Sequence, residues 1–292
     1  MADAPDVVFG EVLFDRFPDG REVLGGAPFN VAWNLHQLGE PVLFVGGVGN
    51  DAAGSRVREA MHAVGLAEDA LFTHPQAPTG AVQVTVEAGE PAYHILPDQA
   101  YDDLPATVDP AVPARIPLLY HGTLALRSGN REQLAALRRR SERRFVDANL
   151  REPWYDPQDV RDLLRGADVV KLNADELGTL FPDVPPAERA DRCLQACDIQ
   201  SALIVTLGAD GAEIHPRAGQ PARARAPVVE GMQDAVGAGD AFASVAILGL
   251  RRGWGWEGTL HRALEFAARV CTLQGATTTD PGFYRSAVAG WT

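Results

Sequence analysis

Lysine is almost absent from this chain of 292 residues: Lys171 is the only one among 26 basic residues, and all the others are arginines. A Walker A loop needs Gly-Lys-Ser/Thr, which does not occur, and protein-kinase machinery is built on a strand lysine with several partner motifs. No G-x-S-x-G elbow and no H-x-x-x-H spacing is present. Any phosphoryl transfer by this protein must therefore proceed without a P-loop lysine.

Cysteine and long apolar runs are also scarce. Cys193, Cys197 and Cys271 are too few for a disulfide framework or a zinc site, and the first two lie one helical turn apart, which favours burial on a helix face. No apolar stretch approaches the roughly 20 residues that span a bilayer. The acidic start MADAPD is unlike a secretory signal. We therefore expect a cytoplasmic protein that does not use a membrane.

Positive charge is in deficit, and the net charge is −13. This balance argues against nucleic acid as a partner, because phosphate contacts along a strand need clustered lysine and arginine. A single nucleotide stays open, since it needs only a local site. The hydrophobic content of 46% is enough for one large core, as one domain or one domain plus an excursion.

Short apolar runs alternate with helical patterns over most of the chain. This alternation predicts an α/β fold in which helices cover a parallel sheet. Strands are expected at 6–9, 42–45, 117–121, 144–147, 168–171 and 202–206. Helices are expected at 28–38, 54–64, 131–143, 157–164, 174–180, 187–197, 239–251 and 260–273.

Two stretches depart from this alternation and are typical of hairpins. Residues 11–24 contain the turn Pro18-Asp19-Gly20, and residues 81–96 alternate in polarity around Ala88-Gly89-Glu90. Together they predict a small β-sheet lid over a cleft. The lid would comprise 11–24 and 81–96, and the body would comprise 1–10, 25–80 and 97–292.

The stretch DAVGAGDAF, residues 234–242, carries the clearest chemical signal. The apolar run that follows predicts a buried helix, at whose start the N–H groups of Gly237, Ala238 and Gly239 would attract an anion, above all phosphate. Asp240 would then be a proton acceptor beside a phosphate cradle, as a phosphotransferase requires. Alternatively, Asp240 merely caps the helix. The stretch taken alone favours neither reading.

The stretch GGAPFN, residues 25–30, follows the first hairpin and opens a helix. Gly25 and Gly26 allow close approach of the backbone, and Asn30 with Asp15 from the hairpin could hold sugar hydroxyls. Tight packing of the glycines, with Asn30 satisfying a turn, is the favoured reading of the motif taken alone.

Two further loops follow strands. Asn173 and Glu176 have the spacing of a capping box, and they could also meet a hydrated Mg²⁺–phosphate cluster; both readings can hold together. The stretch TLGADG, residues 206–211, could admit the ribose and phosphates of a nucleotide, or it is a plain turn into a hairpin.

One stretch imitates a dinucleotide site. GVGNDA, residues 47–52, matches G-x-G-x-x-A after a strand and before a helix. Asp51 would stand where the pyrophosphate must dock, and the stretch is not the first βα turn. A Rossmann dehydrogenase is therefore disfavoured.

Taken together, GGAPFNVAWNLHQLG and DAVGAGDAF resemble the two signatures of the ribokinase (PfkB) family of carbohydrate kinases. The resemblance continues through VGNDAAG, DANLREPW, KLNADE and VTLGADG, and GEVLFDRFPDG is most similar to the fructokinase-like branch. It implies a three-layer α/β/α sandwich with a β lid. It also implies that ATP with Mg²⁺ phosphorylates a primary hydroxyl of a small sugar, with fructose as the first candidate.

The resemblance also implies roles for matched positions. Asp240 becomes the general base, and Gly237, Ala238 and Gly239 form the anion hole. The implied sugar contacts are Asp15, Gly25, Gly26, Asn30 and Arg151. The implied nucleotide and Mg²⁺ contacts are Asn173, Glu176, Thr206, Gly208 and Gly211. Asp234 and Val236 match a monovalent cation (K⁺) site, where Ala235 replaces the threonine that often occurs in the family.

Rival readings share part of this machinery. A kinase of another sugar, a sugar acid or a nucleoside would differ under the lid, and a homodimer could form through the lid. A non-catalytic sugar sensor would bind no ATP, and the intact Gly-Ala-Gly-Asp sequence disfavours it.

Overall fold

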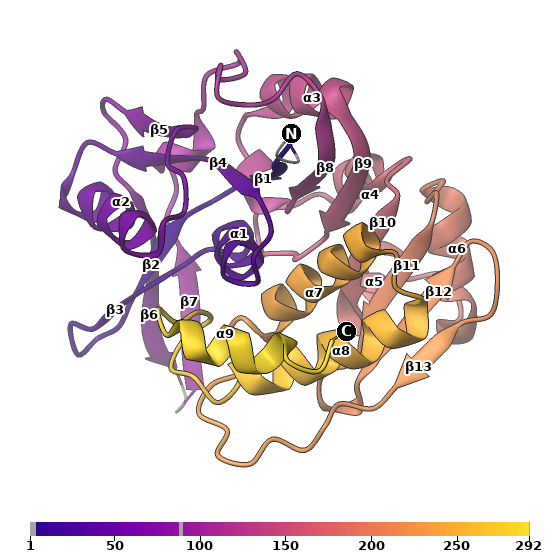
Figure 1. Cartoon of the computed structure of the whole chain (residues 1–292). Coiled ribbons are helices and arrows are strands. Elements are labelled where there is room, and N and C mark those ends of the chain that lie inside the picture. Colours follow the sequence, from indigo (N-terminus) through magenta and orange to yellow (C-terminus); the bar gives the residue numbers. More distant parts are fainter. Residues whose placement is uncertain (1–3, 88–89, 292) are drawn as a thin grey trace.

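The computed structural model describes residues 4–87 and 90–291, which form two β-sheets and the helices around them (Figure 1). The strands of the large sheet are β1 (Asp6–Phe9), β4 (Val42–Gly49), β5 (Leu71–His74), β8 (Ile116–His121), β9 (Ser141–Asp147), β10 (Val169–Asn173), β11 (Ala202–Thr206), β12 (Ala212–Pro216) and β13 (Ala222–Ala224). Their order is β13-β12-β11-β10-β9-β8-β1-β4-β5. All six expected strands occur in it.

The large sheet is mixed, which corrects the expectation of a parallel one. The strands from β11 to β5 in this order pair in parallel, whereas β12 pairs antiparallel with both β11 and β13. The cause is the short connection at 207–211, because a parallel neighbour requires a crossover of a dozen or more residues. This connection is the hairpin turn that the sequence left open as one reading of TLGADG.

Helices cover both faces of this sheet, as the sandwich fold requires. They are α1 (Ala27–Gln37), α2 (Ala52–Val64), α3 (Arg131–Arg140), α4 (Pro157–Leu164), α5 (Ala174–Leu180), α6 (Arg189–Ala196), α7 (Ala238–Arg252), α8 (Trp256–Val270) and α9 (Pro281–Val288). Single 3₁₀ turns are η1 (Ala100–Asp102), η2 (Leu124–Leu126), η3 (Pro186–Glu188) and η4 (Gly208–Asp210). None of the described helices combines the length and apolarity that a membrane span needs.

Alternate residues of the strands supply the two apolar layers. In β1, Val8 packs in a cluster with α1, α2, α7, α8 and α9, whereas Val7 and Phe9 pack in another cluster with α3. This period of two places successive side chains on opposite faces. A third cluster joins β9, β10 and β11 to α4, α5 and α6, and it includes the buried, unbridged thiols of Cys193 and Cys197.

Helix α7 runs through the centre of this arrangement. Its residues 241–249 are buried, as the apolar run predicts, and it packs against α1 and α8. Helix α3 ends three residues earlier than expected. Residues 141–143 belong to β9 instead, where Ser141 pairs with Ile116, so pairing between strands outweighs the helical pattern of the arginine-rich stretch.

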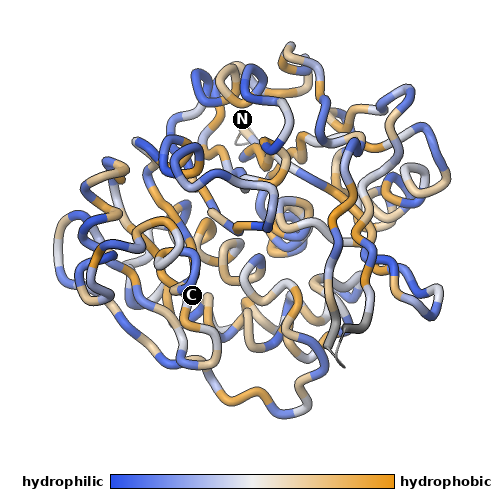
Figure 2. The backbone as a smooth tube through the Cα atoms, turned by 180° about the vertical axis from the view of Figure 1, so that it is seen from behind, coloured by the Kyte–Doolittle hydropathy of each residue, from blue (hydrophilic) through white to orange (hydrophobic). Residues whose placement is uncertain are grey.

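The small sheet has the order β3-β2-β6-β7, with β2 (Leu13–Arg16), β3 (Glu22–Gly25), β6 (Gly80–Glu87) and β7 (Glu90–Ile95). Both expected hairpins form, and β2 joins them by pairing in parallel with β6. The expected turn residues Ala88 and Gly89 lie outside the described residues. Figure 2 shows that many of the outer turns and loop tips are hydrophilic.

Candidate active site

A cavity of about 610 Å³ lies where the large sheet, the small sheet and α7 meet. The ends of β9, β10 and β11 contribute Asp147, Asn173 and Thr206, and Asp15 comes from the small sheet. Ligands of open α/β sheets bind at these carboxyl ends of the strands. The predicted site residues that line the cavity are Asp15, Gly26, Asn30, Arg151, Asn173, Glu176, Thr206, Val236, Gly237, Gly239 and Asp240.

The N-terminus of α7 opens toward this cavity. Gly237 caps the helix at φ +79°, and a Cβ atom there would lie 2.2 Å from Cβ of Ala276, so only glycine fits. Gly237 and Gly239 line the cavity, whereas Ala238 does not, and its N–H donates to the carbonyl of Ala235 at 3.3 Å. Of the three predicted anion-hole residues, Gly237 and Gly239 therefore line the cavity, and their binding of an anion stays a prediction.

Asp240 is a half-buried carboxylate at the wall of the cavity, in the first turn of α7. Its Oδ2 accepts a hydrogen bond of 2.8 Å from Nδ2 of Asn30 on α1. Burial raises the pKa of Asp240 to about 6, although the bond from Asn30 opposes the shift. Asp240 is not the capping residue of α7, which is Gly237, and the Asn30 amide crosses to Asp240 instead of closing a turn.

Lys171 and Asp147 form a buried ion pair at the same end of the cavity, and sequence reasoning assigned neither. Lys171 Nζ donates to Asp147 Oδ2 at 2.7 Å. A Cβ atom built on Gly239 would lie 3.5 Å from this Nζ, so the ammonium group lies beside the start of α7. Burial disfavours the charge of Lys171, but Asp147 and other carboxylates outweigh it and raise its pKa. The position of the only lysine at a strand end was the available signal.

Asn173 and Glu176 form the expected capping box. Asn173 Oδ1 accepts from the N–H of Glu176 at 2.8 Å, and Glu176 Oε2 accepts from the N–H of Asn173 at 2.7 Å. Glu176 Oε1 accepts from the N–H of Leu150 at 2.7 Å. The capping reading is confirmed, and the metal reading stays a prediction.

The donor set nevertheless fits a largely hydrated magnesium ion. Within the described residues no cluster of three His, Cys, Asp or Glu side chains could enclose a metal. Asp147 Oδ1 is buried without a hydrogen-bond partner there, and Glu176 lines the same wall. Mg²⁺ typically keeps several waters and binds through one or two carboxylates plus substrate phosphates.

The two glycines of the TLGADG loop, Gly208 and Gly211, both have a backbone conformation that favours glycine. Thr206 lines the cavity, but Gly208 and Gly211 lie in and after η4, outside the lining. Gly211 has φ +102°, and a Cβ atom there would lie 2.0 Å from the carbonyl oxygen of Ala224 in β13. Their contact with a nucleotide stays a prediction. The stretch GVGNDA, residues 47–52, has a structural role, because Asp51 Oδ1 accepts a hydrogen bond from the N–H of Gly54 at 2.7 Å and caps α2.

Asp15 and Arg151 mark the end of the cavity that faces the small sheet. Burial raises the pKa of Asp15 to about 6, while the charge of Arg151 opposes this shift. Gly26 packs tightly, since at φ +106° its Cβ would lie 2.6 Å from the main-chain oxygen of Glu11. Gly25 does not line the cavity, but its Cβ position is 3.9 Å from Asp15 Oδ2.

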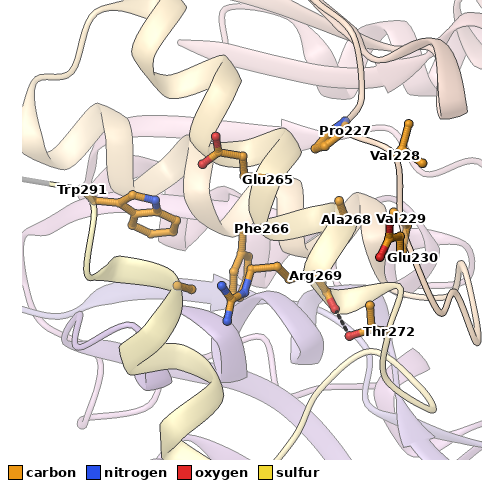
Figure 3. Close-up of a pocket in the computed structure, with 11 residues that line it drawn as sticks. Pro227, Val228, Val229, Glu230, Glu265, Phe266, Ala268, Arg269, Thr272 and Trp291 are labelled. Carbon is orange, nitrogen blue, oxygen red and sulfur yellow. Dashed lines mark hydrogen bonds between the residues drawn. The ribbon is translucent and has the colours of Figure 1, made fainter.

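The segment before α7 links this cavity to a second one. Asp234 Oδ1 accepts from the N–H of Val236 at 3.0 Å, and Val236 lines the first cavity while Asp234 does not. Their binding of a monovalent cation stays a prediction. Residues 227–230 line the second cavity, of about 350 Å³, together with α8 and α9 (Figure 3). Its walls are largely apolar and include Val229, Ala268 and Trp291.

Comparison with known proteins shows the family to which this chain belongs. The family model described as pfkB family carbohydrate kinase matches residues 6–281. The chain therefore belongs to the PfkB family of carbohydrate kinases, and it is a sugar kinase of that family.

Three similar proteins can be compared with this chain over most of its length. A fructokinase of Klebsiella pneumoniae is 31% identical over 83% of this chain and 83% of its own. A bifunctional protein HldE of Bradyrhizobium is 29% identical over 87% of this chain, which spans only 53% of that relative. The structure of a Vibrio cholerae fructokinase double mutant with fructose, ADP and potassium superposes with a TM-score of 0.79 at 25% identity, over 96% and 97% of the chains.

Proposed function

We propose that this protein transfers the γ-phosphate of ATP to a primary hydroxyl of a small sugar, with fructose as the first candidate. The observation that carries the proposal is the half-buried Asp240 carboxylate, held by Asn30, at the N-terminus of α7 in the 610 Å³ cavity. The fructokinase relatives support the choice of sugar. In this proposal Asp240 is the proton acceptor, and the N-terminus of α7 beside it binds the phosphate.

In the proposed reaction Asp240 accepts the hydroxyl proton as the sugar oxygen attacks phosphorus. The N–H groups of Gly237 and Gly239, with the ammonium of Lys171, stabilise the charge that develops on the transferred oxygens. Mg²⁺ bound with ATP would neutralise further phosphate charge. Asn173 and Glu176 would hold its water ligands, with Asp147 beside them.

The small sheet would act as the lid over the sugar. Leu13, Val82, Tyr93 and Ile95 from its strands line the cavity, so closure would exclude water and limit futile hydrolysis of ATP. The division into this lid and the body stays a proposal, as does a homodimer through the lid. Sedimentation equilibrium of the purified chain would test the dimer directly.

The pH dependence of sugar turnover should report Asp240. Because burial raises its pKa to about 6, the carboxyl group is protonated below that pH and cannot accept a proton. We expect kcat/KM for the sugar, at saturating ATP, to fall about tenfold per pH unit below about 6 and to level off above it. Asp15 titrates in the same range, and burial raises the pKa of Glu11 in the same cavity to about 7, so the acidic limb should persist in both Asp15→Asn and Glu11→Gln. A flat profile between pH 5 and 8 would contradict the role of Asp240.

The second cavity is the proposed seat of the nucleotide base. The segment 227–237 leads from its wall to the cradle at Gly237, and apolar walls with few polar groups suit a base. An Ala268→Phe variant should fill this space and raise KM for ATP about tenfold, with KM for the sugar unchanged. Ala187→Phe, on an exposed turn outside both cavities, is the matched control. An unchanged KM for ATP in a folded variant would place the base elsewhere.

A coupled assay of ATP consumption tests the function itself. Turnover should be measured with fructose, ribose, tagatose, 2-keto-3-deoxygluconate and adenosine, each against a blank without acceptor. Sugar-dependent consumption of ATP supports the proposal, and the best acceptor identifies the substrate. Binding of a sugar without any consumption of ATP would instead indicate the non-catalytic sensor.

A further inference from the structure

Glu11 is a buried carboxylate in the wall of the sugar end of the cavity, and neither the signatures nor the comparisons assign it a role. It follows β1, its exposed fraction is 3%, and it lines the cavity with Asp15 and Asp240. Its Oε2 has no hydrogen-bond partner among the residues that the structure describes. A buried acceptor without a donor is costly, so such an oxygen needs an explanation.

Main-chain hydrogen bonds account for part of this carboxyl group but not for Oε2. Glu11 touches the first turn of α1 through its main-chain oxygen, against which Gly26 fits, and that contact would exist with any side chain. The N–H groups of Glu11 and Ala27 favour the charged form of the carboxyl, but burial outweighs them and raises the pKa of Glu11 to about 7. Glu11 lines the cavity, and its Oε2 stays without a donor among the described residues.

A second acceptor lies in the same wall. Asn30 donates from Nδ2 to Asp240, which leaves its Oδ1 buried and, within the described part of the chain, without a donor. Glu11 Oε2 and Asn30 Oδ1 are therefore two acceptors that lack a donor within the described residues. A compound with several hydroxyl groups can donate to both while it turns another hydroxyl to Asp240.

The charges at this end select among such compounds. Glu11, Asp15 and Asp240 are three acidic groups, and the described lining offers two cations, Arg151 and Lys171, the second of which is already paired with Asp147. The charge of Arg151 acts on Glu11, Asp15 and Asp240 alike. A carboxylate or phosphate on the acceptor would add negative charge to a site that already has an excess, and like charges at close range are unfavourable.

We propose that Glu11 is a substrate-binding residue that accepts a hydrogen bond from a second hydroxyl of the acceptor, and that it selects uncharged polyhydroxy sugars over sugar acids and sugar phosphates. This inference rests on the proposed function, since it assigns the acceptor of the same site. Glu11 acts in binding and orientation, and Asp240 remains the base.

The test compares the wild type with Glu11→Gln, which keeps the shape and one acceptor oxygen but replaces the unpaired one by an NH₂ group. Calorimetric binding of the best neutral sugar, without nucleotide, should weaken about 10- to 100-fold, as expected for a lost bond to a charged group. The melting temperature should stay equal or rise, because the variant removes the desolvation cost of a buried carboxylate. Glu59→Gln, exposed on α2 outside the cavity, controls for the loss of one charge.

Singly deoxygenated analogues of that sugar separate binding from a merely structural effect. One analogue should bind the wild type about 10- to 100-fold more weakly than the parent sugar, and Glu11→Gln should bind that analogue and the parent alike. Equal losses with every analogue in both proteins would overturn the assignment. So would an affinity of Glu11→Gln for the parent sugar within twofold of the wild type.

The charge selection has its own measurement. The wild type should favour the neutral sugar over 2-keto-3-deoxygluconate at least tenfold in kcat/KM, and Glu11→Gln should narrow this ratio. A sugar acid that is the better substrate of the wild type would refute the inference while leaving a sugar kinase in place. No consumption of ATP with any acceptor would instead refute the proposed function.

Discussion

An Asp240→Asn variant should lose at least about two orders of magnitude in kcat, since a general base contributes about 10²–10⁴ in rate. The amide can still accept the hydrogen bond from Asn30, but it cannot take a proton from the sugar. The sugar affinity should change little, because the substitution conserves shape and removes an interaction needed in the transition state. Steady-state kinetics with calorimetric sugar binding would measure both quantities.

A carboxylate at the start of another helix supplies a control for Asp240→Asn. Asp175 occupies the first turn of α5 as Asp240 occupies that of α7, but it lies outside the cavity. An Asp175→Asn variant should show the modest stability loss of a missing first-turn carboxylate, about 0.3–1 kcal/mol, with normal turnover. Near wild-type turnover of folded Asp240→Asn would remove Asp240 from the chemistry.

A Lys171→Met variant should lower kcat about 10²- to 10³-fold, the usual effect of removing one preorganised donor from a developing charge. The ammonium lies beside Gly239 and is held by Asp147 at 2.7 Å, so it is placed before the reaction begins. Lys171→Arg should retain part of the activity, because the charge persists. Kinetics at saturating ATP and sugar would give the change in kcat.

Lys171→Met also leaves the buried Asp147 without its partner, so a second measurement is needed. The composition of the chain offers one. Because Lys171 is the only lysine, a chemical probe of amines can label one side chain and the N-terminus alone. ATP should protect Lys171 from labelling and shift the signal of a ¹³C-methylated Lys171. Full turnover of a folded Lys171→Met variant, with labelling unaffected by ATP, would leave Lys171 as a structural partner only.

The fold was largely predictable because its signals are local. The period-two and period-3.6 patterns give the elements, and the two signatures give their arrangement. The exceptions have a common cause. The end of α3 at Arg140 and the antiparallel β12 depend on which strands pair, and pairing is a contact between distant segments.

The candidate site was predictable in part for the same reason. Asp240, Asn30 and Arg151 could be named because they stand in recognisable motifs, and the structure places all three on one cavity. Glu11, Asp147 and Lys171 stand in stretches that the resemblance covers, but the sequence assigned no role to them. Their importance arises from burial and from partners that are remote in sequence, such as the bond between Lys171 and Asp147.

The sequence by itself therefore determined the family, the α/β architecture and the glycine turn that opens α7, because these depend on residue type and short spacing. Only the tertiary structure decided which carboxylates meet in one cavity and which are left without a donor. Burial and unpaired hydrogen bonds are properties of the packed chain, since every polar group in an unfolded chain can be satisfied by water.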